Sequence, residues 1–181
     1  MSAIGFVAGA AGARLDAVLA GVAATLIAEG WMLAGALGEA PEEDAEKCAP
    51  APPARMMLRL LPEGQLLLIS QALGAHAAGC RLDTQALEGA VGLAEAALDV
   101  MPGARPALLI VNRFGKTEAA GRGFRPLIGR ALAEDIPVLI AVSAANMAAF
   151  LAFTEGYGKP LPADIGQVLA WCRQQAGAAR G

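Results

Sequence analysis

The chain has 181 residues, 56% of them hydrophobic, and we expect residues 1–181 to form a single α/β domain with a substantial core. Its formal net charge is −3 and its basic residues are scattered, which argues against a nucleic-acid-binding face. The mean hydropathy of +0.49 is high, but the best candidate for a membrane span, residues 15–37, contains Asp16, Glu29 and Gly30 and has a helical period, so no span is expected.

The opening of the chain predicts a strand, a glycine-rich turn, a helix and a second strand. Residues 3–8 (AIGFVA) form a short apolar run, and residues 9–13 (GAAGA) form a flexible loop. Apolar side chains recur at helical spacing over residues 15–29, with Gly30 placed as a C-terminal cap, before the apolar run 31–37. This order is that of a βαβ unit. Because no basic segment precedes it, we expect no signal peptide and predict a cytoplasmic protein.

Residues 38–55 differ from the rest of the chain in composition. They contain an acidic run, residues 42–46 (EEDAE), and the proline-rich stretch 49–54 (APAPPA). Such a segment cannot bury an apolar face, so we predict an exposed loop. Two interpretations remain open, a lid over a site and an insertion without a role.

The remainder of the chain predicts a hairpin followed by alternating helices and strands. The hairpin joins residues 56–61 to residues 65–71 through Pro62-Glu63-Gly64. Strands are then expected at residues 107–111 (ALLIV) and 137–142 (PVLIAV), helices at 84–100, 125–134, 144–153 and 163–175, and a polar loop at 112–123. The alternation predicts a three-layer α/β sandwich whose mostly parallel sheet has the hairpin as an antiparallel edge.

The first glycine-rich loop is a candidate phosphate site. A phosphate-binding loop needs glycines whose N–H groups surround the phosphates, a Lys for the outer phosphates, and a Ser or Thr for magnesium. Residues 9–16 read GAAGARLD, so the Lys and the Ser or Thr are missing and Asp16 would repel a phosphate. The candidate anion-binding residues are Gly9, Ala10, Gly12, Ala13 and Arg14. A turn that serves only packing is the alternative.

The segment after the strand at 107–111 stands where a triphosphatase carries the acidic residues that hold magnesium. Asn112 and Arg113 occupy those two positions, which weakens magnesium binding. Glu118 is the nearest remaining carboxylate, and it is the catalytic candidate if the chain is active. The polar residues favour instead an anion-binding rim, with a neutral turn as the alternative. The candidates for that rim are Asn112, Arg113, Gly115 and Lys116.

Further polar candidates lie between the hairpin and the helix that follows it. His76 is the only histidine and is expected to be structural. Cys80 and Asp83, with Arg81 between them, form a cluster that could bind a soft metal or an oxyanion. Two ligands do not make a metal site, and no CxxC pair is present, so we predict no metal centre and no disulfide framework.

Three segments carry a family resemblance: residues 67–88 (LLISQALGAHAAGCRLDTQALE), 108–128 (LLIVNRFGKTEAAGRGFRPLI) and 137–153 (PVLIAVSAANMAAFLAF). They look like a bacterial family of domains of unknown function described as nucleoside-triphosphatase-like. The resemblance covers nearly the whole chain and implies a P-loop triphosphatase-like fold. Genes of that family are often found near molybdenum-transport functions, which implies a link to molybdate or metal handling.

A more distant resemblance is to the small P-loop nucleoside triphosphatases. Residues 112–118 (NRFGKTE) are similar in frame to the acidic magnesium-binding motif of those enzymes, and they match it at Gly115, Lys116 and Glu118. The two leading acids of the motif have no counterpart here. The phosphate-loop Lys and Ser or Thr have none either.

Three hypotheses follow. The first is a non-hydrolytic protein that binds a nucleotide, or else molybdate or another oxyanion, between residues 9–14 and 112–116. The second is an active magnesium-dependent triphosphatase in which Arg14 replaces the Lys and Glu118 is the base or metal ligand. The third is a homodimeric interaction protein without a small ligand.

Overall fold

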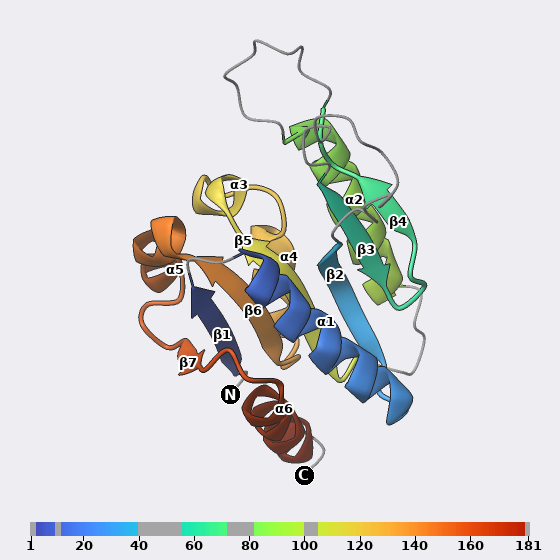
Figure 1. Ribbon diagram of the computed structural model, residues 1–181, viewed down its shortest axis with the longest axis vertical. Helices are drawn as coiled ribbons and strands as arrows, with labels where there is room; N and C mark the ends of the chain where they lie inside the picture. The colour runs from blue at the N-terminus through green and yellow to red at the C-terminus, as the bar shows by residue number, and fades with distance from the viewer. Residues whose placement is uncertain (1–2, 10–11, 40–55, 72–81, 100–104, 180–181) are drawn as a thin grey trace, which may run out of the picture.

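The computed structural model describes residues 3–9, 12–39, 56–71, 82–99 and 105–179. Their strands form one seven-stranded sheet in the order β4-β3-β2-β5-β6-β1-β7 (Figure 1). The strands are β1 (Ile4–Gly9), β2 (Leu33–Glu39), β3 (Met57–Leu61), β4 (Leu66–Leu68), β5 (Leu108–Phe114), β6 (Val138–Ser143) and β7 (Lys159–Leu161). All pairs are parallel except β2 with β3 and β3 with β4. The predicted parallel sheet with an antiparallel edge hairpin is therefore confirmed.

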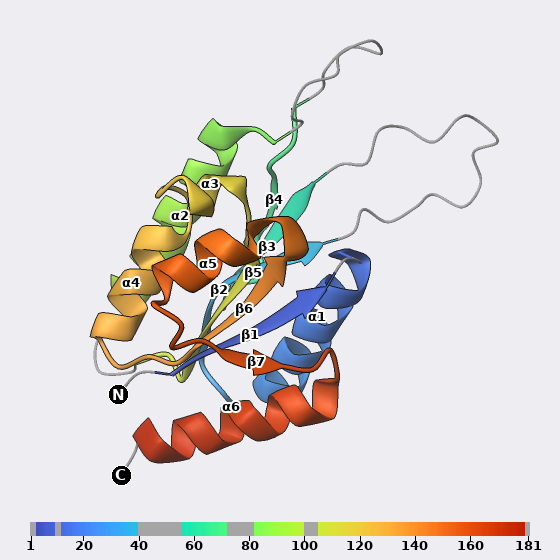
Figure 2. The same ribbon diagram turned by 90° about the vertical axis from the view of Figure 1, so that its left-hand side faces the viewer.

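Helices cover both faces of the sheet and make three layers. Two helices pack on one face, α1 (Gly12–Ala28) and α6 (Ile165–Ala179). On the other face lie α2 (Thr84–Asp99), α4 (Arg125–Ala133) and α5 (Met147–Phe153) (Figure 2). None of the helices in the described segments combines the length and apolar character needed to cross a bilayer.

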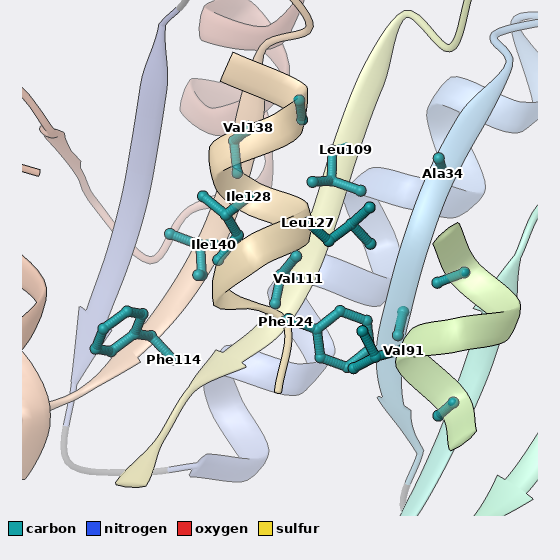
Figure 3. Close-up of a cluster of buried hydrophobic side chains, with 14 of the residues drawn as sticks. Ala34, Val91, Leu109, Val111, Phe114, Phe124, Leu127, Ile128, Val138 and Ile140 are labelled. Atoms are coloured by element: carbon teal, nitrogen blue, oxygen red, sulfur yellow. The ribbon is translucent and has the colours of Figure 1, made fainter. Parts of the chain in front are cut away.

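A hydrophobic core lies on each face of the sheet, and alternate side chains of β5 contribute to both cores. Leu109 and Val111 face α4, where they meet Leu127 and Ile128 (Figure 3). Leu108 and Ile110 point to the opposite face and belong to the core under α1. Because both faces are covered, the strand is apolar at every position from 108 to 111, as expected of a buried parallel strand.

Helix α1 ends as its sequence predicts. Gly30 has a φ of 80°, a left-handed conformation that glycine adopts without steric cost. The Gly30 N–H donates to the Ile27 carbonyl, and the Trp31 N–H donates to the Leu26 carbonyl. These two bonds satisfy carbonyl groups that the last turn of a helix otherwise leaves unpaired. They also turn the chain directly into β2.

Several sequence-based boundaries are wrong. The predicted loop 112–123 is not a single loop, because β5 continues to Phe114 and a short helix, α3 (Lys116–Ala119), follows it. Strand β7 was not predicted, since its three residues have no apolar alternation, and α1 begins at Gly12 rather than at residue 15. Gly38 and Glu39, predicted as loop, complete β2, and residues 40–55 lie outside the described residues.

Candidate functional site

The carboxyl ends of β2 and β5 border a pocket. The two strands are parallel neighbours, so their ends meet at the same edge of the sheet, where open α/β sheets bind ligands. The pocket has a volume of about 450 Å³. It is lined by Asp16, Gly38, Glu39, Met56, Met57, Leu58, Ile69, Leu82, Leu87, Asn112, Arg113, Gly115, Lys116, Thr117, Glu118 and Phe124.

Asp16 of α1 contacts the end of β5. Its Oδ1 accepts a hydrogen bond from Asn112 Nδ2 at 2.8 Å and another from Arg113 Nη2 at 2.8 Å. A Cβ added to Gly12 would lie 2.9 Å from Arg113 Nη1, so the guanidinium rests against the first residue of α1. Gly12 and Asp16 are four residues apart and share one face of the helix, which allows Arg113 to contact both. The two segments predicted to form an anion site therefore meet.

The position of Arg113 changes the expected electrostatics. From the sequence alone, Asp16 would repel a phosphate, but the ion pair with Arg113 compensates its charge. Both side chains stay partly exposed, at 39% for Arg113 and 26% for Asp16, and both residues line the pocket. The Arg113 guanidinium carries five N–H donors, more than one carboxylate oxygen uses.

Asn112 is held more tightly than its neighbour. The residue is 6% exposed, and its side chain lies against Gly38, where an added Cβ would be 2.5 Å from Nδ2. Its Oδ1 has no hydrogen-bond partner among the described residues. A neutral amide at this position gives the pocket no acidic group at the end of β5.

A second carboxylate of the pocket, Glu39, is also paired. Arg59 of β3 donates from Nε to Glu39 Oε2 at 2.7 Å and from Nη2 to Oε1 at 2.6 Å. These hydrogen bonds hold the pKa of the Glu39 carboxyl below its usual value. The bidentate geometry is the preferred one for Arg with a carboxylate.

Glu118, the catalytic candidate of the active hypothesis, is bound by backbone groups. Its Oε2 accepts from the Gly115 N–H at 2.9 Å, and its Oε1 accepts from the Phe124 N–H at 3.1 Å. The side chain is 3% exposed, and burial raises its pKa despite these two hydrogen bonds. The two carboxylate oxygens thus hold the backbone on either side of α3 in place, so the role of Glu118 in this structure is a structural one.

The other predicted site residues are more dispersed. Gly9 ends β1, and Arg14 is exposed on α1. Neither is among the residues that line the pocket. Asp83 caps α2, since its Oδ1 accepts from the N–H groups of Gln85 and Ala86. The described residues do not include Ala10, His76, Cys80, Arg81 or the side chain of Ala13.

The apolar wall of the pocket and the role of Glu39 are not apparent from the sequence. Met57, Leu58, Ile69 and Leu82 come from the hairpin and the segment before α2, where an apolar pattern predicts core and nothing more. Glu39 and Arg59 lie on paired antiparallel strands, but the register that brings them together is not readable from the sequence. Across the described residues, no three His, Cys, Asp or Glu side chains are close enough to hold a metal ion.

Comparisons with known proteins agree with this fold. The family described as "Protein of unknown function (DUF2478)" matches residues 4–171. The chain is 34% identical over 161 residues to the molybdenum import ATP-binding protein ModC 2 of Bradyrhizobium diazoefficiens. That match covers 88% of this chain and 17% of the relative, so the chain spans a small part of that protein's length.

A solved structure is similar over nearly its whole length. It is the solution structure of a human cancer-related nucleoside triphosphatase, with a TM-score of 0.63, and the match covers 98% of this chain and 97% of that one. The sequence identity is 14%, so the likeness is one of fold. The expected P-loop triphosphatase-like fold is confirmed.

Proposed function

The chain belongs to the DUF2478 family of proteins of unknown function, and we propose that it binds a nucleotide or a related oxyanion without hydrolysing it. One observation carries the proposal. Arg113 and Lys116 stand beside a pocket of about 450 Å³ in which Asp16 and Glu39 are each paired with an arginine. An anionic ligand therefore meets Lys116, which joins none of the ion pairs among the described residues, and the N–H donors of Arg113 that Asp16 does not use.

The absence of hydrolysis is supported by the groups at the end of β5. Magnesium binds to hard oxygen ligands, above all carboxylates. Asn112 and Arg113 supply a neutral amide and a cation instead, and Asp16 is engaged by both of them. Glu118 uses its two oxygens on backbone N–H groups. No carboxylate of this group is left to position a metal or an attacking water.

A link to molybdate handling is the finer part of the proposal. It is supported by the similarity to a protein named as a molybdenum import ATP-binding protein. Molybdate is a tetrahedral dianion, and N–H donors of the kind that Arg113 and Lys116 present are suited to oxyanions. Because the chain covers 17% of that relative, the molybdenum import and ATP binding stated in its name are attributed to that relative and not to this chain.

Calorimetric titration of the purified chain with AMP, ATP, GTP and molybdate tests the proposal, together with an assay for phosphate release in the presence of magnesium. We expect heat of binding with at least one of these ligands and no release above the buffer control. Lys116→Gln should weaken the binding by about tenfold, since it removes a charged donor. Lys159→Gln is the matched control, because Lys159 is an exposed lysine on β7 outside the pocket lining.

Two results would contradict the proposal. If none of the four ligands binds, the proposal that the chain binds a nucleotide or an oxyanion is wrong. Magnesium-dependent phosphate release that disappears in Glu118→Gln would establish the alternative, an active triphosphatase. In that case the carboxylate that caps α3 would also be catalytic.

A further inference from the structure

We infer that the pocket takes a small organic molecule with a single phosphate group, such as a nucleoside monophosphate, in preference to a triphosphate or a bare oxyanion. This inference rests on the proposed function, and it names the class of ligand. Three independent properties of the pocket support it: its size, its division into an apolar and a polar wall, and its balance of charge.

The size exceeds what an oxyanion needs. A tetrahedral anion of five heavy atoms fills on the order of 100 Å³, roughly three water volumes. The pocket has about 450 Å³, which falls in the usual range of about 300–1,000 Å³ for sites that hold organic ligands. A phosphate bound at Arg113 and Lys116 would therefore leave most of the cavity unfilled. An organic group attached to that phosphate would occupy the remainder.

The lining is divided in a way that matches such a ligand. The polar wall lies at the ends of β2 and β5 and at the start of α1 and α3, and it consists of Asp16, Glu39, Asn112, Arg113, Lys116, Thr117 and Glu118. An apolar wall comes from β3, from α2 and from the segments that flank them. It consists of Met56, Met57, Leu58, Ile69, Leu82 and Leu87.

The apolar wall suits a planar ring. Leu58, Ile69 and Leu87 are buried and give it a fixed floor. Met56, by contrast, is 42% exposed. Methionine side chains adapt their shape and contact aromatic rings favourably through sulfur. A bare oxyanion would gain nothing from this wall, whereas a nucleobase would be removed from water by it.

The charge balance limits the ligand to few negative charges. Asp16 is paired with Arg113, and Glu39 is paired with Arg59. Lys116 takes part in none of the ion pairs found within the described residues. Glu118, the third carboxylate of the lining, is 3% exposed and accepts hydrogen bonds from two backbone N–H groups. Lys116 is therefore the one cation of the described lining that is not in an ion pair. A monophosphate, with about two negative charges at neutral pH, exceeds that single cation by less than a triphosphate does, and the two further phosphates of a triphosphate would meet no additional unpaired cation of the described lining.

Calorimetry with AMP, GMP, ATP, inorganic phosphate and molybdate on the full chain tests the inference. We expect a monophosphate nucleotide to bind at least about tenfold more tightly than inorganic phosphate or molybdate, because the base adds buried apolar area. We expect ATP to bind no more tightly than AMP. Leu82→Trp, which fills the apolar wall at a half-buried position, should weaken nucleotide binding by about tenfold and leave phosphate binding unchanged.

Two further variants keep this test decisive. Leu93→Trp makes the same change at an exposed position of α2 outside the pocket lining, and it should leave all affinities as they are. If Leu82→Trp does not fold, Met57→Ala replaces it. That change removes a side chain from the same wall and should weaken nucleotide binding but not phosphate binding.

The outcomes separate this inference from the proposed function. ATP binding more than about tenfold tighter than AMP would overturn the inference and leave nucleotide binding in place. Phosphate or molybdate binding as tightly as AMP, with no effect of either wall variant, would also overturn it and leave an oxyanion-binding protein. If none of the five compounds binds, both the inference and the proposed function are wrong.

Discussion

Arg113 donates to the carboxylate of Asp16 at 2.8 Å across a sequence separation of 97 residues. This ion pair joins the first turns of α1 to the end of β5, and it places the guanidinium against Gly12. The positive end of the α1 dipole and the guanidinium thus lie close together, with one carboxylate to balance them. The Asp16 carboxylate therefore competes with any anion that approaches this edge of the sheet for the Arg113 guanidinium.

Asp16→Asn should strengthen the binding of a phosphate-bearing ligand. The substitution keeps an oxygen that accepts from Asn112 and Arg113 but removes the negative charge beside the guanidinium. We expect about fivefold tighter binding of AMP and a change in unfolding free energy of at most about 1 kcal/mol, since the pair is partly exposed. Isothermal titration measures the first quantity and urea denaturation the second.

Asp99→Asn is the matched control for this prediction. Asp99 is the partner of Arg130 in another ion pair, and it does not line the pocket. Its neutralisation should leave ligand affinity unaltered. Weaker binding in Asp16→Asn would show that the carboxylate helps to hold the ligand and does not compete with it.

Asn112→Asp should create a response to magnesium that we do not expect of the native chain. The new carboxylate would face the Asp16 carboxylate in a position that is 6% exposed, so repulsion and burial should lower the unfolding free energy by about 2–4 kcal/mol. Magnesium at millimolar concentration should recover part of that loss by bridging the two acids. Thermal unfolding with and without magnesium gives the measurement.

Asn112→Ala serves as the comparison, because it removes the amide without adding charge. Its unfolding midpoint should not depend on magnesium. An equal magnesium effect in both variants and in the native chain would mean that the metal acts elsewhere.

Glu118 makes the stability of the fold depend on pH. Burial raises its pKa in the folded state, so the folded chain holds this proton more tightly than the unfolded chain does. The stabilisation that protonation brings is complete below the unfolded pKa of about 4.3, and it is lost as the pH rises through the higher folded value. The native chain should therefore lose stability relative to Glu118→Gln as the pH rises from about 4 into the neutral range.

Urea denaturation of both proteins over this range isolates the titration of Glu118, because the other carboxyl groups are common to the two. The variant gives up one of the two backbone acceptors, so it should start from a lower stability at acidic pH. A difference that is constant with pH would contradict the assignment. So would a difference that grows in favour of the native chain.

Cys172 should be unreactive while the chain is folded. It is 1% exposed on α6, and burial raises the pKa of its thiol to about 12, so almost no thiolate is present at neutral pH. In a Cys48→Ser, Cys80→Ser background, mass spectrometry after iodoacetamide treatment should show no adduct in buffer and a full adduct in denaturant. Rapid labelling of the folded protein would mean that α6 opens readily.

The predictable parts of this fold are those in which a local pattern determines the outcome. The βαβ opening follows from apolar periodicity and from Gly30. The end of β5 does not, because Phe114 continues the strand through its contacts with Phe150 and Phe153 of α5, ring centroids 5.3 Å and 5.9 Å away. Those partners lie far along the chain, so no local sequence pattern predicts these ring contacts.

The candidate site divides in the same way. The lack of acids at Asn112 and Arg113 is visible in the sequence, and so is the cationic Lys116. The ion pair between Arg113 and Asp16 cannot be read from the sequence, since it depends on how α1 lies against β5. The capping role of Glu118 is likewise a consequence of the turn that brings the Gly115 and Phe124 amides to its two oxygens. Side-chain pairing across elements is a tertiary property.

Amide chemical-shift mapping with AMP tests directly whether the pocket at the ends of β2 and β5 binds a phosphate-bearing ligand. We expect saturable shifts at Gly38, Asn112, Gly115 and Lys116, all of which line the pocket, with one common dissociation constant. The Lys116→Gln variant should show the same shifts at higher ligand concentration. No saturable shift at these residues, or shifts confined to the far end of the sheet around Arg105 and Ile136, would show that AMP does not bind in this pocket.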